Sequence, residues 1–139
     1  MNKGDSESRM DFYDLIPKNK YDISNIEKLK QLTTKEIEPI LPALLEWIQD
    51  RNWPVAEALL PVLALHQSAL TPLIMNILSP KEEDNIWKYY IITCLLPLFS
   101  DACIAPLLPS LKRIAENPTQ NEILEETNSA AFAFLQDRT

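Results

Sequence analysis

The residue types best suited to catalysis or metal binding are few in this chain of 139 residues. The single histidine, His66, has no cysteine near it, and the two cysteines, Cys94 and Cys103, lie nine positions apart within apolar runs. Metal sites and nucleophilic dyads need tighter clusters. We therefore expect two buried thiols and a histidine at the negative end of a helix. We expect no catalytic residue, metal or cofactor.

Three charged side chains near the N-terminus are candidates for ligand binding. Lys18, Lys20 and Asp22 lie close together in a segment that must pack on the first helices. The two ammonium groups could hold an anion or a carboxylate as point charges. Alternatively, the three side chains form exposed ion pairs, which contribute little to stability. We favour the ion pairs and keep the three residues as a candidate site.

Aromatic residues mark a second candidate surface. Trp53 and Trp87 stand 34 positions apart, each at the expected start of a helix. A buried tryptophan there would fill the junction between neighbouring helix pairs, and an exposed one would anchor a partner. Lys88 and Tyr89 follow Trp87 directly and are candidates for a concave binding face.

Short polar side chains occupy the expected turns between helices. Asp50, Asn52 and Asn117 are of the types that cap the helix that follows them. A row of such turns on a rigid scaffold could also form one edge of a binding surface. We keep Asp50 and Asn52 as candidate binding residues.

The elements that must position these residues follow from a proline-containing repeat. The sequence IEPILPAL at 37–44 returns as IAPLLPSL at 104–111, and a weaker copy, LTPLIMNI, lies at 70–77. Similarity at intervals of 33 or 34 residues is typical of stacked helix pairs, since one pair cannot bury its apolar face alone.

The expected helices follow from apolar spacing and capping residues. A capping box of Ser24 and Glu27 predicts the first helix, Thr33 or Thr34 caps the next turn, and Ser100 caps a later one. The repeat then predicts three helix pairs: 39–50 with 54–65, 68–78 with 85–99, and 100–116 with 118–136. The last helix is expected to bury Ile123, Leu124, Thr127, Ala130, Ala131, Phe134 and Leu135.

The predicted fold class is all-α. Gly4 is the only glycine, whereas there are 11 prolines, so hairpin-rich folds and glycine-loop nucleotide sites are disfavoured. We expect a right-handed stack of antiparallel helix pairs, a HEAT-like α-α superhelix of about three repeats plus an N-terminal helix. It occupies residues 12–139 as one domain, after a disordered leader at 1–11.

The net charge of −7 disfavours nucleic acid as a partner, because phosphate binding needs clustered Lys and Arg. Lys112 and Arg113 are the only adjacent basic pair. Glu116, Glu122, Glu125 and Glu126 form an acidic stretch, which we interpret as a solvated helix face. The N-terminus has no apolar signal region and no run is long enough to span a membrane, so a cytoplasmic protein is expected.

Several longer motifs resemble a bacterial family. These are LIPKNKYD at 15–22, LLEWIQDRNWPVA at 44–56, WKY at 87–89 and AENPT at 115–119. Together they resemble a family of short bacterial proteins described as a domain of unknown function, similar in style to HEAT repeats. The resemblance covers residues 15–137 and implies the fold and a bacterial cytosolic setting, but no activity. Relatives often carry Asp and His where this chain has Asn19 and Tyr21, which argues against acid–base or metal chemistry there.

The functional hypothesis is a non-enzymatic interaction module that binds a protein or peptide, since stacked helix pairs offer an extended surface. One specific form is an acidic, immunity-type inhibitor of a basic effector. The alternative class is a nucleic-acid or small-molecule binding protein of the HEAT-like type. A monomer or a weak homodimer is expected.

Overall fold

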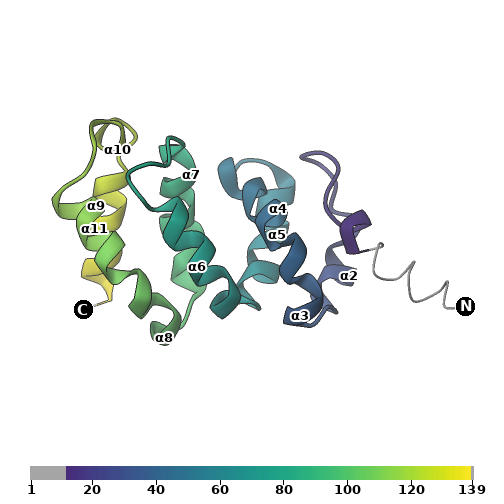
Figure 1. Cartoon of the computed structure of the whole chain (residues 1–139). Coiled ribbons are helices and arrows are strands. Elements are labelled where there is room, and N and C mark those ends of the chain that lie inside the picture. The colour runs from purple at the N-terminus through teal and green to yellow at the C-terminus, as the bar shows by residue number, and fades with distance from the viewer. Residues whose placement is uncertain (1–11, 139) are drawn as a thin grey trace, which may run out of the picture.

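The computed structural model of the protein describes residues 12–138, and every regular element among them is helical (Figure 1). The predicted all-α fold class is therefore confirmed. The predicted leader at 1–11 lies outside the described residues. The first and last described residues lie at opposite ends of an elongated row of helices.

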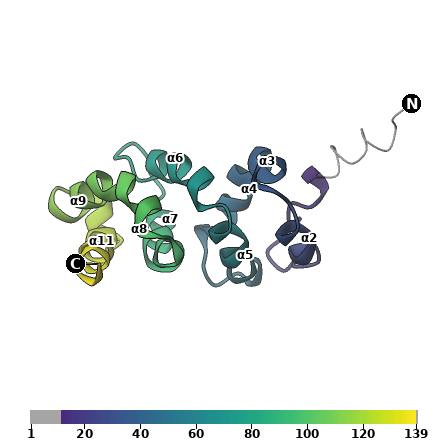
Figure 2. The ribbon, with the colours of Figure 1, turned by 90° about the horizontal axis from the view of Figure 1, so that it is seen from below.

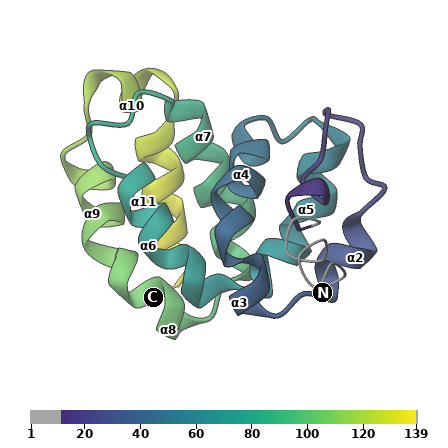
Figure 3. The ribbon, with the colours of Figure 1, turned by 45° about the vertical axis from the view of Figure 1, so that its right-hand side comes forward.

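Two layers of helices make up this row (Figure 2). The layer that we call A contains α3 (Thr34–Ile37), α4 (Leu41–Glu46), α6 (Gln67–Ile77) and α9 (Leu108–Glu116). Layer B contains α2 (Ile26–Lys30), α5 (Pro54–Ala64), α7 (Asn85–Tyr90) and α11 (Thr127–Asp137). The chain alternates between the layers, and the turns that lead into α5, α7 and α10 (Gln120–Leu124) lie along one edge (Figure 3).

The repeated prolines interrupt two stretches of layer A in the same way. The first stretch is α3, the 3-10 turn η1 (Glu38–Ile40) and α4, and the last is α8 (Asp101–Ile104), η5 (Ala105–Leu107) and α9. Pro39 and Pro106 lie within the two 3-10 turns. Proline has no N–H to donate to a preceding carbonyl, so each helix tightens there rather than continuing as an α-helix.

Side-chain caps start several helices, as predicted in two cases out of three. The Thr33 side chain accepts from Glu36 N and Glu36 completes a capping box, and the Ser100 side chain accepts from Cys103 N. The capping box expected at Ser24 is absent, because the Ser24 hydroxyl donates to Asp22 Oδ1 at 2.6 Å instead.

The stretch of layer B that begins with α7 contains two more residues than its equivalent in α5. Trp53 and Trp87 differ by 34 positions, but Pro61 and Pro97, which share the Leu-Leu-Pro motif, differ by 36. The π-helix η3 (Ile91–Leu95) lies between Trp87 and Pro97, before the 3-10 turn η4 (Leu96–Leu98). A π-helix has more residues per turn, so it absorbs added residues without ending the stack.

One apolar core lies along the row. It is made of side chains that are almost completely buried, among them Ile37, Leu44, Ile48, Leu59, Leu63, Leu70, Ile74, Leu95, Leu107, Leu111 and Ala131. Each fully buried Leu or Ile contributes about 1.5–3 kcal/mol relative to an exposed one. This core is the main source of rigidity for any surface the stack presents.

The predicted last helix is divided into two, which corrects the expectation of one continuous helix. Residue Glu126 adopts φ 59°, a left-handed conformation, between α10 and α11. The break turns Ile123 and Leu124 outward, at 49% and 66% exposure, where burial was expected. Thr127, Ala130, Ala131 and Phe134 are buried as predicted and Leu135 is partly buried.

Candidate functional site

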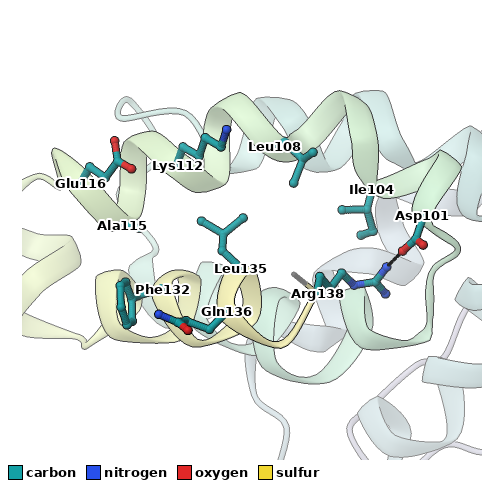
Figure 4. Close-up of a pocket in the computed structure, with 10 residues that line it drawn as sticks. All are labelled: Asp101, Ile104, Leu108, Lys112, Ala115, Glu116, Phe132, Leu135, Gln136 and Arg138. Carbon is teal, nitrogen blue, oxygen red and sulfur yellow. Dashed lines mark hydrogen bonds and ion pairs between the residues drawn. The ribbon is translucent and has the colours of Figure 1, made fainter.

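A groove of about 520 Å³ lies between α9 and α11, at the end of the row where the described chain ends (Figure 4). Its apolar lining consists of Ile104, Leu108, Ala115, Phe132 and Leu135. Figure 4 shows Leu108 and Ile104 facing Leu135 across the groove. The Phe132 side chain, at 57% exposure, is unusually accessible for a phenylalanine.

The groove lies where the repeat pattern would place a further helix pair. Leu108 occupies the repeat position of Leu41 and Ile74, which are 1% and 0% exposed. Those two side chains are buried within the row, whereas Leu108 is only partly buried. Within residues 12–138 the groove thus exposes part of a repeat position that is buried in the two earlier repeats.

The next turn of α9 carries a charged residue, Lys112, where the two earlier repeats carry leucine. Lys112 stands at the repeat position of Leu45 and Leu78, which are 1% and 0% exposed. A lysine at this position is compatible with solvent or with a polar partner, whereas a leucine requires burial. This substitution is the sequence signal that could have revealed the groove.

Side chains of following repeats also contact the main chain at this position. Trp87 Nε1 donates to the carbonyl of Leu45 at 3.1 Å, and Arg113 Nη2 donates to the carbonyl of Leu78 at 3.0 Å. At each of these two positions, a side chain of the following repeat therefore adds a hydrogen bond to the apolar contacts between neighbouring helices. A ligand that binds in the groove would mainly have to contact its apolar lining.

Charged residues border the groove. Arg138 forms an ion pair with Asp101 at one end and donates to the carbonyl of Phe99 at 2.8 Å. Lys112 and Glu116 lie one turn apart on α9, both exposed, and neither side chain makes a hydrogen bond or ion pair within residues 12–138. Two opposite charges are therefore available beside an apolar floor.

The predicted entry cluster forms a turn rather than a set of ion pairs. The Asp22 carboxylate accepts from the Ser24 hydroxyl and from Lys18 N, and these hydrogen bonds lower the pKa of Asp22. The Lys20 ammonium lies 5.5 Å from the centre of the Tyr21 ring, and the Lys20 carbonyl accepts from Val55 N. These contacts attach the entry segment to the start of α5.

The turn before α5 is also held by local contacts. Asp50 Oδ1 accepts from Asn52 N at 2.9 Å, which makes an Asx-type turn. The Trp53 ring packs edge-on against Trp47, with centroids 5.6 Å apart. Asp50 and Trp53 are partly buried and Asn52 is exposed, so only Asn52 of the three presents its side chain freely.

The expected concave-face residues separate into different environments. Trp87 is partly buried and joins two repeats through its bond to Leu45, in agreement with the junction interpretation. Tyr89 is partly buried against Tyr90, with ring centroids 5.6 Å apart. Lys88, expected to line a concave face, is fully buried, so the expectation of an accessible ammonium is corrected.

A buried charge cluster explains the burial of Lys88. Lys88 Nζ lies 2.7 Å from Glu122 Oε2, and Arg113 binds both Glu122 oxygens at 2.8 Å. Lys88 also donates to the carbonyl of Ser79. Glu122 was expected on a solvated face, but its side chain is 0% exposed because two cations hold it inside.

The Glu122 carboxylate is stabilised in its charged form. Burial alone would raise its pKa, but hydrogen bonds from Arg113, Lys88 and the backbone of Thr119 outweigh burial and lower the pKa to about 2. Thr119 and Glu122 form a capping box at the start of α10. The Thr-x-x-Glu pattern was the signal that could have revealed this role.

The remaining titratable candidates are the two cysteines and the histidine. Cys94 and Cys103 are free and partly exposed, where full burial was expected. His66 is buried at the start of α6, with Nδ1 2.8 Å from the Thr34 hydroxyl. Within residues 12–138 no three His, Cys, Asp or Glu side chains are arranged to hold a metal ion, and none of the helices there could cross a membrane.

These features define a class: an all-helical protein whose helices form two layers, with an apolar groove between α9 and α11. The chain belongs to a family described as "Domain of unknown function (DUF5071)", whose model matches residues 15–135. A comparison with curated proteins found no match.

Proposed function

We propose that the protein is a non-enzymatic interaction module, built as a HEAT-like right-handed stack of helix pairs. Its docking site is the groove between α9 and α11, and its ligand is an amphipathic helix of a partner protein. The observation that carries this proposal is the partial exposure of Leu108, whose repeat equivalents Leu41 and Ile74 are buried.

The lining of the groove specifies the partner's chemistry. Ile104, Leu108 and Leu135 require an apolar stripe, which a helix supplies at positions i, i+3, i+4 and i+7. The unpaired charges of Lys112 and Glu116 favour an acidic and a basic residue beside that stripe. We place the protein in the bacterial cytosol on the basis of the family resemblance.

The test uses display selection of amphipathic helical peptides on the wild-type protein. Selected peptides are then measured by calorimetry against Phe132→Asp and against the matched control Leu65→Asp. Both side chains are exposed, at 57% and 60%, so neither variant should unfold. We expect Phe132→Asp to weaken binding about tenfold or more and Leu65→Asp to leave it unchanged. Equal binding by both variants, or no binding peptide at all, would refute the proposal.

A second candidate is an acidic inhibitor of a basic effector protein. A polar cleft of about 440 Å³ lies between the starts of α7 and α10, and it is lined by Glu83, Asp84, Asn85, Ile86, Asn121, Leu124 and Glu125. Three carboxylates there favour a cationic partner, with an affinity that salt should reduce. Glu83→Gln combined with Glu125→Gln should weaken such a complex and lower its salt dependence.

Nucleic-acid binding receives less support. The adjacent basic pair Lys112 and Arg113 would be its anchor, but Arg113 is engaged with Glu122 and the Leu78 carbonyl. Its side chain is 24% exposed. A guanidinium held in this way has few donors left for a phosphate.

A further inference from the structure

We propose that the helical partner of the groove is a second copy of this chain, docked about a twofold axis. This inference rests on the proposed function, because it takes the same groove as the docking site. Each copy would place its α9–α11 end against the same end of the other. The resulting dimer is closed, since a twofold interface uses one patch on both subunits.

The apolar features of this end are self-complementary. The groove offers a floor of Leu108 and Leu135, and Phe132 stands at its border with more than half of its surface exposed. A twofold axis brings the Phe132 of each copy to the groove of the other, so both rings are buried together. Exposed aromatic side chains beside a matching pocket are typical centres of interfaces.

The charges of this end are also self-complementary, although the whole chain carries −7. The charged residues that line the groove are two basic and two acidic ones: Lys112, Arg138, Asp101 and Glu116. The local charge is therefore balanced, and a second copy is not repelled here. If the two α9 helices run antiparallel across the axis, Lys112 of each copy faces Glu116 of the other, which gives two equivalent ion pairs.

The position of the groove permits this arrangement without obstruction. The N-terminal helices lie at the far end of the row, away from α9 and α11 (Figure 1). A dimer through the groove would be an elongated, continuous stack with both N-terminal ends outward. It would also bury Leu108, whose repeat equivalents Leu41 and Ile74 are buried within the row.

The first experiment is sedimentation equilibrium over micromolar to millimolar concentrations of the whole chain. The wild type should rise from the mass of one chain toward that of two and no further. Phe132→Asp should weaken dimerisation about tenfold or more, whereas Leu65→Asp should not. A wild type that stays at one chain overturns the second-copy inference, and so does growth beyond two, which would indicate open head-to-tail stacking.

A charge exchange tests the twofold geometry directly. Lys112→Glu alone and Glu116→Lys alone each create two like-charge contacts, so each should dimerise about tenfold more weakly. Mixing the two variants restores both opposite-charge contacts, so a mixed dimer should form with an affinity near that of the wild type. Equal affinities for the separate and mixed variants would overturn the geometry, and circular dichroism checks that both variants are folded.

The selected peptides separate failure of this inference from failure of the proposed function. A monomeric wild type that binds a helical peptide in a Phe132-dependent way refutes the second copy and leaves the docking site standing. A monomeric wild type that binds no peptide refutes both. A dimer that such a peptide dissociates supports both.

Discussion

Lys88 and Glu122 stand 34 residues apart in the chain, and Lys88 Nζ lies 2.7 Å from Glu122 Oε2 with both side chains at 0% exposure. This spacing is one repeat, so the pair joins equivalent positions of neighbouring repeats. Two charges leave water only when each finds enough partners. Arg113 supplies the second cation, and the Ser79 carbonyl accepts from the Lys88 ammonium.

Removing the Glu122 charge should strongly destabilise the protein. Glu122→Gln leaves Lys88 buried without its counter-ion, and the loss of such a partner typically costs about 3–5 kcal/mol. Glu125→Gln is the matched control, because that side chain is exposed and should change stability by less than about 0.5 kcal/mol. The measurement is the free energy of unfolding in urea.

A double variant tests whether the charge itself is required. Lys88→Met with Glu122→Gln removes the buried ammonium, so it should recover part of the stability lost in Glu122→Gln. A single variant as stable as the wild type would show that the cluster contributes nothing.

Acid should unfold the protein through the same carboxylate. The pKa of Glu122 is lowered from 4.5 to about 2, because hydrogen bonds from Arg113 and Lys88 outweigh burial. Its contribution, on the order of 3 kcal/mol, is therefore present above 4.5 and is lost as the pH falls toward 2. Urea midpoints measured across this range should fall steeply for the wild type and less steeply for Glu122→Gln.

His66 should give a separate pH dependence at milder pH. Burial lowers its pKa below 6.5, and its Nε2 has no hydrogen-bond partner in the structure. The unfolded chain then binds a proton more readily, so the free energy of unfolding falls as the pH drops below 6.5. His66→Gln should remove this slope while keeping an acceptor for Thr34, and an unchanged slope would contradict the assignment.

The indole of Trp87 should contribute through its hydrogen bond as well as its area. Trp87→Phe keeps an aromatic ring but removes the donor to the Leu45 carbonyl, so we expect a loss of about 1 kcal/mol from the hydrogen bond, with the smaller ring adding to it. Trp47→Phe is the control, because the indole of Trp47 makes no hydrogen bond within residues 12–138. The difference between the two variants in thermal unfolding isolates the hydrogen bond, and equal losses would show that it is unimportant.

Much of the fold could be predicted because it depends on local signals. The Thr33 and Ser100 caps and Pro54 at the first position of α5 act within a few residues, and the structure confirms each of them. The sequence repeat then predicts the order in which these helices follow one another along the chain.

The buried charges could not be predicted because their partners are distant in sequence. Lys88 and Glu122 are ordinary surface residue types, and burial is permitted only because the stack brings them together. The groove was missed for a related reason: an apolar position such as Leu108 predicts burial, but not which neighbour provides it.

The break at Glu126 left no signal in the sequence, and it supplies a final prediction. A non-glycine residue with φ near 59° costs about 1–2 kcal/mol, which glycine avoids. Glu126→Gly should therefore stabilise the protein by about 1 kcal/mol. Glu125→Gly removes the same charge at φ −97°, a conformation open to any residue, so it should be destabilising or neutral. A gain in stability for Glu126→Gly without a gain for Glu125→Gly in urea unfolding would establish the break between α10 and α11, and equal changes would contradict it.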